Sequence, residues 1–117
     1  VWLSSGPEVI AAQLNRHRIM VVPSIYREPF GIVALEGLAC GCRMVASREG
    51  GLLEAAGGHA LVFRNGDSDD LANALAIALQ EPAPGQEELA AISAHLGRHT
   101  RRAIAQRYLA AFEDAAR

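Results

Sequence analysis

Two glutamates, Glu28 and Glu36, stand on either side of a segment whose residue types suit the binding of a phosphorylated ligand. The segment spans residues 28–36 and has the sequence EPFGIVALE. Residues 19–24 (IMVVPS), shortly before it, have the apolar composition of a buried strand. A strand, a glycine-containing turn and a helix form the arrangement by which α/β folds hold phosphate. The segment therefore predicts a phosphate-binding turn with a carboxylate on each side.

The expected positions of the two carboxylates follow from their neighbours. Pro29 excludes the helical conformation from Glu28, so this residue belongs in the loop at the carboxyl end of the strand. Open parallel sheets bind ligands at that edge. Gly31 tolerates a positive φ, so a helix is expected to begin near Gly31 or Ile32. Glu36 then lies about one turn inside, and its side chain leans toward the free N–H groups of the helix start.

The carboxylates restrict the kind of ligand that fits. A bare phosphate at the helix start would be repelled by a neighbouring carboxylate, whereas a diol can donate hydrogen bonds to it. A nucleotide with its ribose carries both groups. The alternative is that neither acid binds a ligand. Glu28 would then be a solvated loop acid, and Glu36 an acid in the first turn of the helix that the helix dipole stabilises.

Five short motifs, all close to this segment, share the pattern of one enzyme family. They are VVPS at 21–24, EPFG at 28–31, EGLACG at 36–41, MVAS at 44–47 and GGLLE at 50–54. In this order they resemble retaining glycosyltransferases of the two-Rossmann-domain (GT-B) type, family 4 or group 1, which include glycogen and sucrose synthases. The resemblance implies transfer of a sugar from a nucleotide diphosphate donor to an acceptor, with no metal or other cofactor.

The resemblance also implies a role for individual residues. Glu28 would contact hydroxyls of the transferred sugar and is the candidate catalytic residue, and Glu36 would bind the ribose hydroxyls. The remaining candidates would meet the donor through their backbone or line its cleft. They are Phe30 and Gly31 at the sugar, Ile32 and Val33 at the distal phosphate, and Gly50, Gly51 and Ser24 along the cleft. For Gly50 and Gly51, a simple tight turn is the alternative.

Composition excludes several other classes. The chain has 117 residues, 50% of them hydrophobic, and a net charge of −2, which allows one domain with a modest core. All 11 basic residues are arginine, but the net charge is not positive, which argues against nucleic-acid binding.

The cysteines and histidines suggest neither a disulfide nor a zinc site. Cys40 and Cys42 are too close for a framework disulfide, and His95 with His99 lacks a third zinc ligand. Cys40 is expected to fill a small buried space.

Length and ends indicate a piece of a longer protein. The chain opens with Val1-Trp2-Leu3, which looks like the middle of a strand, and shows neither a signal peptide nor a membrane span. We therefore expect a cytoplasmic protein whose acceptor domain and first half of the donor domain are missing from this chain. Any contact with a membrane surface is expected only through those missing parts.

Strands that alternate with helices predict an α/β fold with about four parallel strands flanked by helices. The resemblance implies that residues 1–117 form one partial Rossmann-like domain. Strands are expected at 1–4, 19–22, 43–47 and 59–63. Helices are expected at 8–17, 32–39, briefly after Gly51, from Asp67 or Ser68 onward, and as C-terminal helices within 86–117 (87–96 and 100–116).

Two apolar stripes on these helices are expected to face a core. The first consists of Leu71, Leu75, Ala78 and Leu79, and the second of Ile104, Tyr108, Ala111, Phe112 and Ala115. In the resembled family the terminal helix crosses onto the other domain, so part of the second stripe is expected to need an absent partner.

Three functions remain open from the sequence. The first is the donor-binding part of a retaining glycosyltransferase, expected to be inactive and to bind nucleotide weakly when isolated. The second is a sugar-nucleotide epimerase of the same architecture, which the acid pair disfavours. The third is a non-catalytic Rossmann-like assembly module, which the presence of both acids and both glycine turns disfavours.

Overall fold

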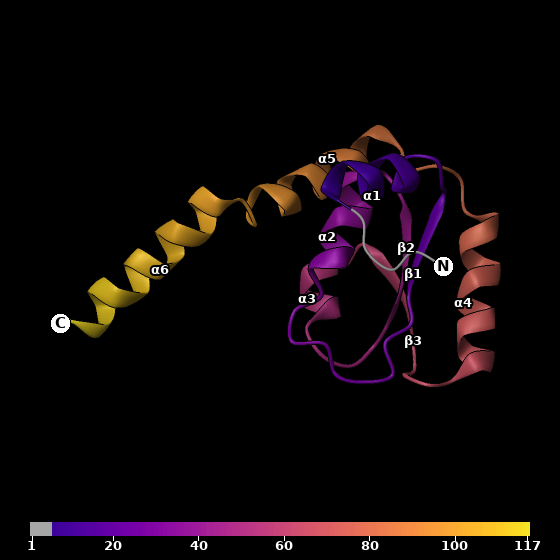
Figure 1. The fold of residues 1–117 in the computed structure, drawn as a ribbon, viewed down its shortest axis with the longest axis horizontal. Helices are drawn as coiled ribbons and strands as arrows, with labels where there is room; N and C mark the ends of the chain where they lie inside the picture. Colours follow the sequence, from indigo (N-terminus) through magenta and orange to yellow (C-terminus); the bar gives the residue numbers. More distant parts are fainter. Residues whose placement is uncertain (1–5) are drawn as a thin grey trace.

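The computed structural model describes residues 6–117, which form a three-stranded parallel sheet with helices on both faces (Figure 1). The strands lie in the order β1-β2-β3. In chain order the elements are α1 (Pro7–Leu14), β1 (Ile19–Val22), α2 (Ile32–Ala39), β2 (Arg43–Ser47), α3 (Leu52–Ala56), β3 (Ala60–Phe63), α4 (Ser68–Gln80), α5 (Gln86–Gly97) and α6 (Arg101–Ala115). The predicted α/β, Rossmann-like class is confirmed. The strand expected at 1–4 lies outside the described residues.

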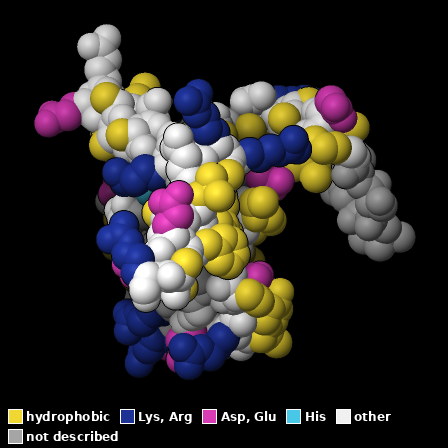
Figure 2. Space-filling view, turned by 90° about the vertical axis from the view of Figure 1, so that its left-hand side faces the viewer, with side chains coloured by type: hydrophobic (Ala, Val, Ile, Leu, Met, Phe, Trp, Pro, Cys, Tyr) yellow, Lys and Arg dark blue, Asp and Glu magenta, His cyan; other side chains and the backbone are white. Residues whose placement is uncertain are grey.

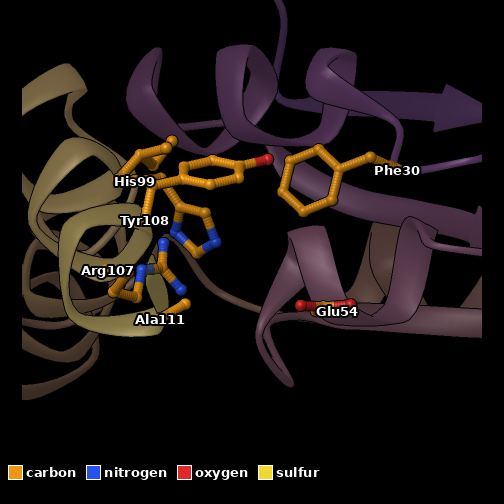
Figure 3. A pocket seen from close by; sticks show the side chains of 7 residues that line it. Phe30, Glu54, His99, Arg107, Tyr108 and Ala111 are labelled. Carbon is orange, nitrogen blue, oxygen red and sulfur yellow. The ribbon is translucent and has the colours of Figure 1, made fainter. Parts of the chain in front are cut away.

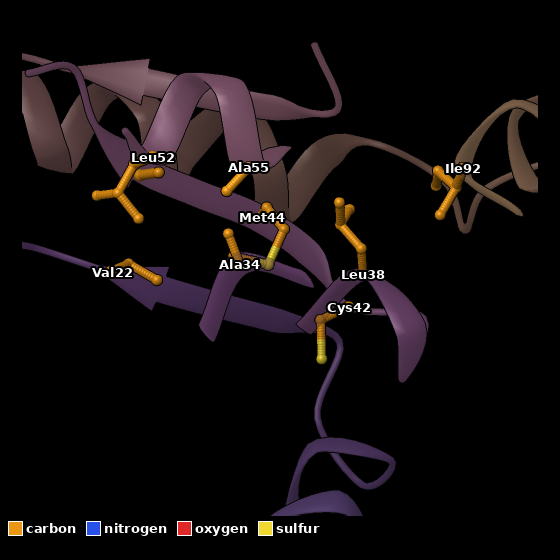
Figure 4. Packing of buried hydrophobic residues seen from close by; sticks show 9 residues of the cluster. Val22, Ala34, Leu38, Cys42, Met44, Leu52, Ala55 and Ile92 are labelled. Atoms are coloured by element: carbon orange, nitrogen blue, oxygen red, sulfur yellow. The ribbon is translucent and has the colours of Figure 1, made fainter. Parts of the chain in front are cut away.

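The central strand β2 carries the core. Its register pairs Val45 with Val21 on β1 and with Leu61 on β3, and successive side chains point to opposite faces. On one face, Met44 packs among Ala34 of α2 and Ala55 of α3 (Figure 4). On the other face, Val45 and Phe63 pack against α4. Helices therefore cover the sheet on both sides, as apolar parallel strands require.

Close packing of α2 on the sheet depends on a glycine. A Cβ at Gly37 would lie 2.5 Å from the sulfur of Met44 and 2.6 Å from that of Met20. The buried Met44 and the partly buried Met20 thus occupy the space that a side chain would need. Because α2 carries the second glutamate of the motif, this contact fixes where that carboxylate stands relative to the sheet.

Helix α4 begins as predicted. The Asp67 side chain accepts a hydrogen bond from the Asp70 amide at 2.9 Å, which caps the helix. The predicted apolar stripe is partly wrong, because Leu79 is 63% exposed and Ala74 is buried in its place. Ala74 and Ala78 are four residues apart and share a face of the helix, whereas Leu79 is rotated about 100° from Ala78.

The first residue of β2 ties the sheet to the connection between α4 and α5. The Arg43 guanidinium lies 3.0 Å from the Glu81 carboxylate and 2.5 Å from that of Glu88, and it donates to the Pro82 carbonyl at 2.8 Å. Only 16% of the Arg43 side chain is exposed. This residue therefore fastens the C-terminal helices to the body of the domain.

The two cysteines differ from the expectation. Cys42, not Cys40, is the buried one, and its thiol donates to the carbonyls of Leu14 and His17. Burial, together with the nearby Cys40, raises the pKa of the Cys42 thiol. Cys40 is only partly buried, and it packs against the same core cluster as Cys42.

Helix α6 does not join the core. None of its residues is buried, and it projects away from the body of the domain (Figure 1). Tyr108 is 63% exposed and Phe112 is 68% exposed, so the core role expected for this stripe is wrong within residues 6–117. Figure 2 views the molecule from the side toward which α6 points, and hydrophobic side chains gather down the middle of that face. No helix among the described residues is both long and apolar enough to cross a membrane.

Candidate functional site

The loop between β1 and α2 holds Glu28 at the carboxyl edge of the sheet. The Ser24 hydroxyl donates to Oε1 of Glu28 at 3.0 Å, and the Tyr26 hydroxyl donates to the same oxygen at 3.0 Å. Glu28 is half-buried, whereas Tyr26 is 61% exposed. The hydrogen bond to Glu28, and then its negative charge, raise the pKa of the Tyr26 phenol. The phenol therefore stays protonated and remains a donor to the carboxylate.

The loop after β2 packs directly against this segment through its two glycines. Glu28 and Gly50 form an isolated parallel bridge, and the Gly51 amide donates to the Glu28 carbonyl at 2.6 Å. A Cβ at Gly50 would lie 2.5 Å from that carbonyl oxygen, and one at Gly51 would lie 2.5 Å from Cα of Phe30. Both glycines are therefore required for the contact of the two loops, whatever they contribute to a ligand.

The loop after β3 supports the other two. The Asn65 side chain accepts from the Glu49 amide at 2.9 Å, and its amide group contacts the Tyr26 carbonyl at 3.5 Å. Loops that follow all three strands thus meet at one edge. This is the edge at which parallel α/β sheets bind ligands.

The start of α2 agrees with the prediction. Gly31 is the N-cap residue with φ 84°, and α2 begins at Ile32. A Cβ at Gly31 would collide with the side chain of Leu52, so position 31 requires glycine for both its φ and its packing. No side chain caps the helix. The side chain of Ile32 is 65% exposed, and that of Val33 is half-buried against the core.

The two glutamates occupy different surroundings. A hydrogen bond within its own loop joins Glu28 to Ser24, and contacts between loops bring it together with Gly50 and Gly51. Glu36 is exposed one turn into α2, and within residues 6–117 it forms no side-chain hydrogen bond or ion pair. It borders a groove of about 260 Å³, together with Leu96, His99 and other residues of α2 and the α5–α6 junction. Its carboxylate is therefore free to accept hydrogen bonds.

A second cleft lies between the site loop and α6. It has a volume of about 410 Å³, and Figure 3 shows Phe30 and Tyr108 on its walls with Glu54 opposite Arg107. Phe30 is the one predicted site residue among those lining it. The Phe30 ring contacts His99, with 5.6 Å between the ring centroids. This cleft thus adjoins the loop between β1 and α2, but neither Glu28 nor Glu36 lines it.

The two histidines near this cleft, His95 and His99, each lie within hydrogen-bond distance of a backbone carbonyl. His95 is 4% exposed, and its Nε2 lies 2.7 Å from the Ala55 carbonyl oxygen. Its ring contacts that of His99 in a tilted arrangement, with 4.6 Å between the centroids and 58° between the planes, and His99 Nδ1 lies 3.0 Å from the His95 carbonyl oxygen. No group of three metal-ligating side chains occurs in the part of the chain that the structure describes.

Sequence reasoning missed Tyr26, and it considered His99 only as a zinc ligand and not as a neighbour of Phe30. Tyr26 lies two positions before Glu28, a spacing that places both side chains on one side of an extended loop, so it could have been found. The contact of His99 with Phe30 depends on how α5 packs against α2, which no local sequence pattern reveals. Both contact residues of the predicted site.

Comparisons with known proteins point to one family. The profile of the family described as glycosyl transferases group 1 matches residues 2–95. A D-inositol 3-phosphate glycosyltransferase of Stackebrandtia nassauensis is 45% identical over 100 residues, which cover 83% of this chain and 22% of that protein. The Rhodococcus opacus protein of the same name is 37% identical over 96 residues, covering 80% of this chain and 20% of that protein.

A third relative matches a shorter segment. This glycosyltransferase of Methanocaldococcus jannaschii, described as uncharacterized, is 58% identical over 36 residues, covering 31% of this chain and 9% of that protein. The chain spans about a fifth of the length of the first two relatives. With a family profile that covers most of its residues and a Rossmann-like sheet, the chain belongs to the group 1 glycosyl transferases.

Proposed function

We propose that this chain is the C-terminal part of the donor-binding domain of a retaining glycosyltransferase that uses a nucleotide diphosphate sugar. Glu28 would meet hydroxyls of the transferred sugar, the start of α2 would meet the diphosphate, and Glu36 would bind the ribose. The observation that carries the proposal is the position of the Glu28 carboxylate. It is held at the carboxyl edge of the sheet, beside Gly50 and immediately before an uncapped helix start.

The helix start is suited to a leaving diphosphate. Because no side chain caps α2, its first N–H groups are available to an anion, and the helix dipole adds partial positive charge. Gly31 brings the backbone close without a side chain in the way. The amides of Phe30, Gly31, Ile32 and Val33 would therefore stabilise negative charge that develops as the sugar leaves. No resident metal or cofactor is part of this proposal.

Glu36 is suited to a diol. Its carboxylate is exposed and borders a groove, and two adjacent hydroxyls can donate to its two oxygens. A hydrogen bond to a charged group contributes about 1.5–3 kcal/mol, so the loss of one weakens binding roughly 10- to 100-fold. Ribose is the part of a nucleotide donor that carries such a diol.

The rest of the site would come from the rest of the protein. The resemblance assigns the cations that clamp the diphosphate, and the acceptor domain, to segments outside this chain. We therefore expect the isolated chain to be inactive and to bind a nucleoside diphosphate weakly. The names of the relatives from Stackebrandtia and Rhodococcus make D-inositol 3-phosphate the first acceptor to test.

The test is incubation of the intact protein with UDP-, GDP- and ADP-sugars, with and without D-inositol 3-phosphate. The expected result is acceptor-dependent release of nucleoside diphosphate, with a product whose anomeric configuration, measured by NMR, matches that of the donor. An epimerised donor without transfer would favour the epimerase alternative. Absence of both reactions, with nucleotide binding also absent, would favour an assembly module.

A further inference from the structure

The two oxygens of the Glu28 carboxylate have different surroundings. The hydroxyls of Ser24 and Tyr26 both donate to Oε1, each at 3.0 Å. One carboxylate oxygen offers about two lone-pair positions, so these two donors use the capacity of Oε1. Oε2 accepts no hydrogen bond from residues 6–117. A substrate hydroxyl that approaches Glu28 therefore finds one occupied oxygen and one free oxygen.

The backbone that carries this carboxylate is also held. The Glu28 carbonyl accepts from the Gly51 amide at 2.6 Å, and Glu28 pairs with Gly50 as in a parallel sheet. The Tyr26 carbonyl is contacted by the Asn65 side chain, which also receives the Glu49 amide. Contacts at the backbone and at Oε1 together leave the carboxylate little freedom to rotate.

We propose that Ser24 and Tyr26 are positioning residues that turn Glu28 so that Oε2 accepts a hydrogen bond from one particular hydroxyl of the transferred sugar. The inference rests on the proposed function, in which Glu28 faces that sugar. Tyr26 is 61% exposed, so its hydroxyl makes this hydrogen bond at the surface of the site and not within the core. Its position explains how a single carboxylate selects one hydroxyl among several: the orientation of the carboxylate is fixed before the donor arrives.

A purely structural role makes a different prediction. If Tyr26 and Ser24 only fasten the loop, their loss impairs every donor by the same factor. If they aim Oε2, their loss matters for a donor that carries the selected hydroxyl and not for one that lacks it. A cycle of protein and substrate changes separates the two roles.

The experiment uses the intact enzyme and its preferred donor, together with analogues deoxygenated at one sugar hydroxyl at a time. kcat/KM is measured for the wild type, Tyr26→Phe, Ser24→Ala, the double variant and Glu28→Gln. Ser93→Ala is the control, because it removes an exposed hydroxyl on α5 that makes no side-chain hydrogen bond within residues 6–117. Tyr26→Phe keeps the ring of an exposed side chain, so folding is expected to be unchanged.

One deoxygenated donor is expected to lose roughly 10- to 100-fold in kcat/KM with the wild type. With the parent donor, Tyr26→Phe and Ser24→Ala are each expected to lose about 3- to 10-fold, as for one hydrogen bond. With that one deoxygenated donor, neither variant is expected to differ from the wild type by more than about twofold, within the usual error of additivity.

Two outcomes overturn different claims. Equal losses for Tyr26→Phe with the parent and with every deoxygenated donor would refute the positioning role. If Glu28→Gln at the same time abolished the difference in kcat/KM between the parent and the deoxygenated donor, the assignment of Glu28 to the sugar would hold without the positioning role of Ser24 and Tyr26. Full discrimination retained by Glu28→Gln would instead refute the assignment of Glu28 to the sugar.

Discussion

The loops at the carboxyl edge of the sheet and the helix α6 both carry residues suited to a ligand or a partner, but only the loops are held in place. The loop residues are joined by hydrogen bonds and glycine contacts across three connections, at Glu28, Gly51 and Asn65. Helix α6 buries none of its residues, and Tyr108 and Phe112 are more than half exposed. The side chains of the loops are thus held in position by other residues of the domain, whereas those of α6 are not.

This difference shows which parts of a site the chain can form by itself. The loop contacts lie entirely within residues 24–65, so they do not require another domain. The apolar face of α6 contacts little within the described residues, and its exposed aromatic rings favour a partner outside them. We expect that partner to be another part of the same protein, as the resemblance implies.

The largest effect is expected from filling the space between the two loops. Gly51→Ala places a methyl group against the Pro29 carbonyl and the Phe30 backbone, although the φ of −77° at Gly51 suits any residue. We expect the free energy of unfolding to fall by about 2–3 kcal/mol, as for an overpacked contact. Chemical denaturation measures it.

Gly85→Ala is the control for this change, because a Cβ at Gly85 meets nothing within 4 Å and its φ is −75°. Gly85 is the N-cap residue of α5, a position where alanine is less favourable than glycine, so the free energy of unfolding is expected to fall by no more than about 1 kcal/mol. If Gly51→Ala were as stable as Gly85→Ala, the loops would not be held together as described.

A smaller effect is expected where the C-terminal helices meet the body of the domain. Arg43→Ala removes one guanidinium that binds Glu81, Glu88 and the Pro82 carbonyl. Because its partners are about one-third exposed and can be solvated, we expect a loss of about 1–2 kcal/mol in the free energy of unfolding. Arg64→Ala, which breaks the ion pairs of a 67% exposed arginine with Asp67 and Asp70, is expected to cost less than about 1 kcal/mol. Equal losses for the two variants would contradict the fastening role of Arg43.

The smallest effect is expected on α6. Phe112→Ser changes a 68% exposed side chain, so the free energy of unfolding of this 117-residue chain should change by no more than about 0.5 kcal/mol. The same substitution in the intact protein is expected to destabilise it more, because the ring would leave an apolar interface. A large loss in the isolated chain would mean that α6 packs on the domain after all.

Much of the fold could be predicted because local signals agree with it. The apolar runs predict β1 and β2 within the bounds observed, and the Pro29 and Gly31 signals place the start of α2. The same sequence could not show that Phe112 is exposed or that Leu79 turns away from the core. Amphipathic periodicity shows which side of a helix is apolar, but not whether the chain supplies a surface to cover it.

The candidate site was predictable to a similar degree. The positions of Glu28, Gly31 and Glu36 follow from the strand–turn–helix pattern, and the structure agrees with them. That Gly51 is packed against Phe30, and that Tyr26 donates to Glu28, depends on contacts between loops and on rotamers. Such contacts are set by tertiary packing and leave little trace in the sequence.

The assignment of Glu36 to the ribose is the most direct test of the proposed donor site. Calorimetry would measure the affinity of the intact protein for a nucleoside diphosphate and for its 2′,3′-dideoxy analogue, in the wild type, in Glu36→Ala and in the control Glu87→Ala, an exposed acid on α5. The wild type and the control are expected to bind the dideoxy analogue roughly 10- to 100-fold more weakly, whereas Glu36→Ala should bind both ligands with one similar, weak affinity. Equal discrimination by Glu36→Ala and the wild type would contradict the donor site described for this chain.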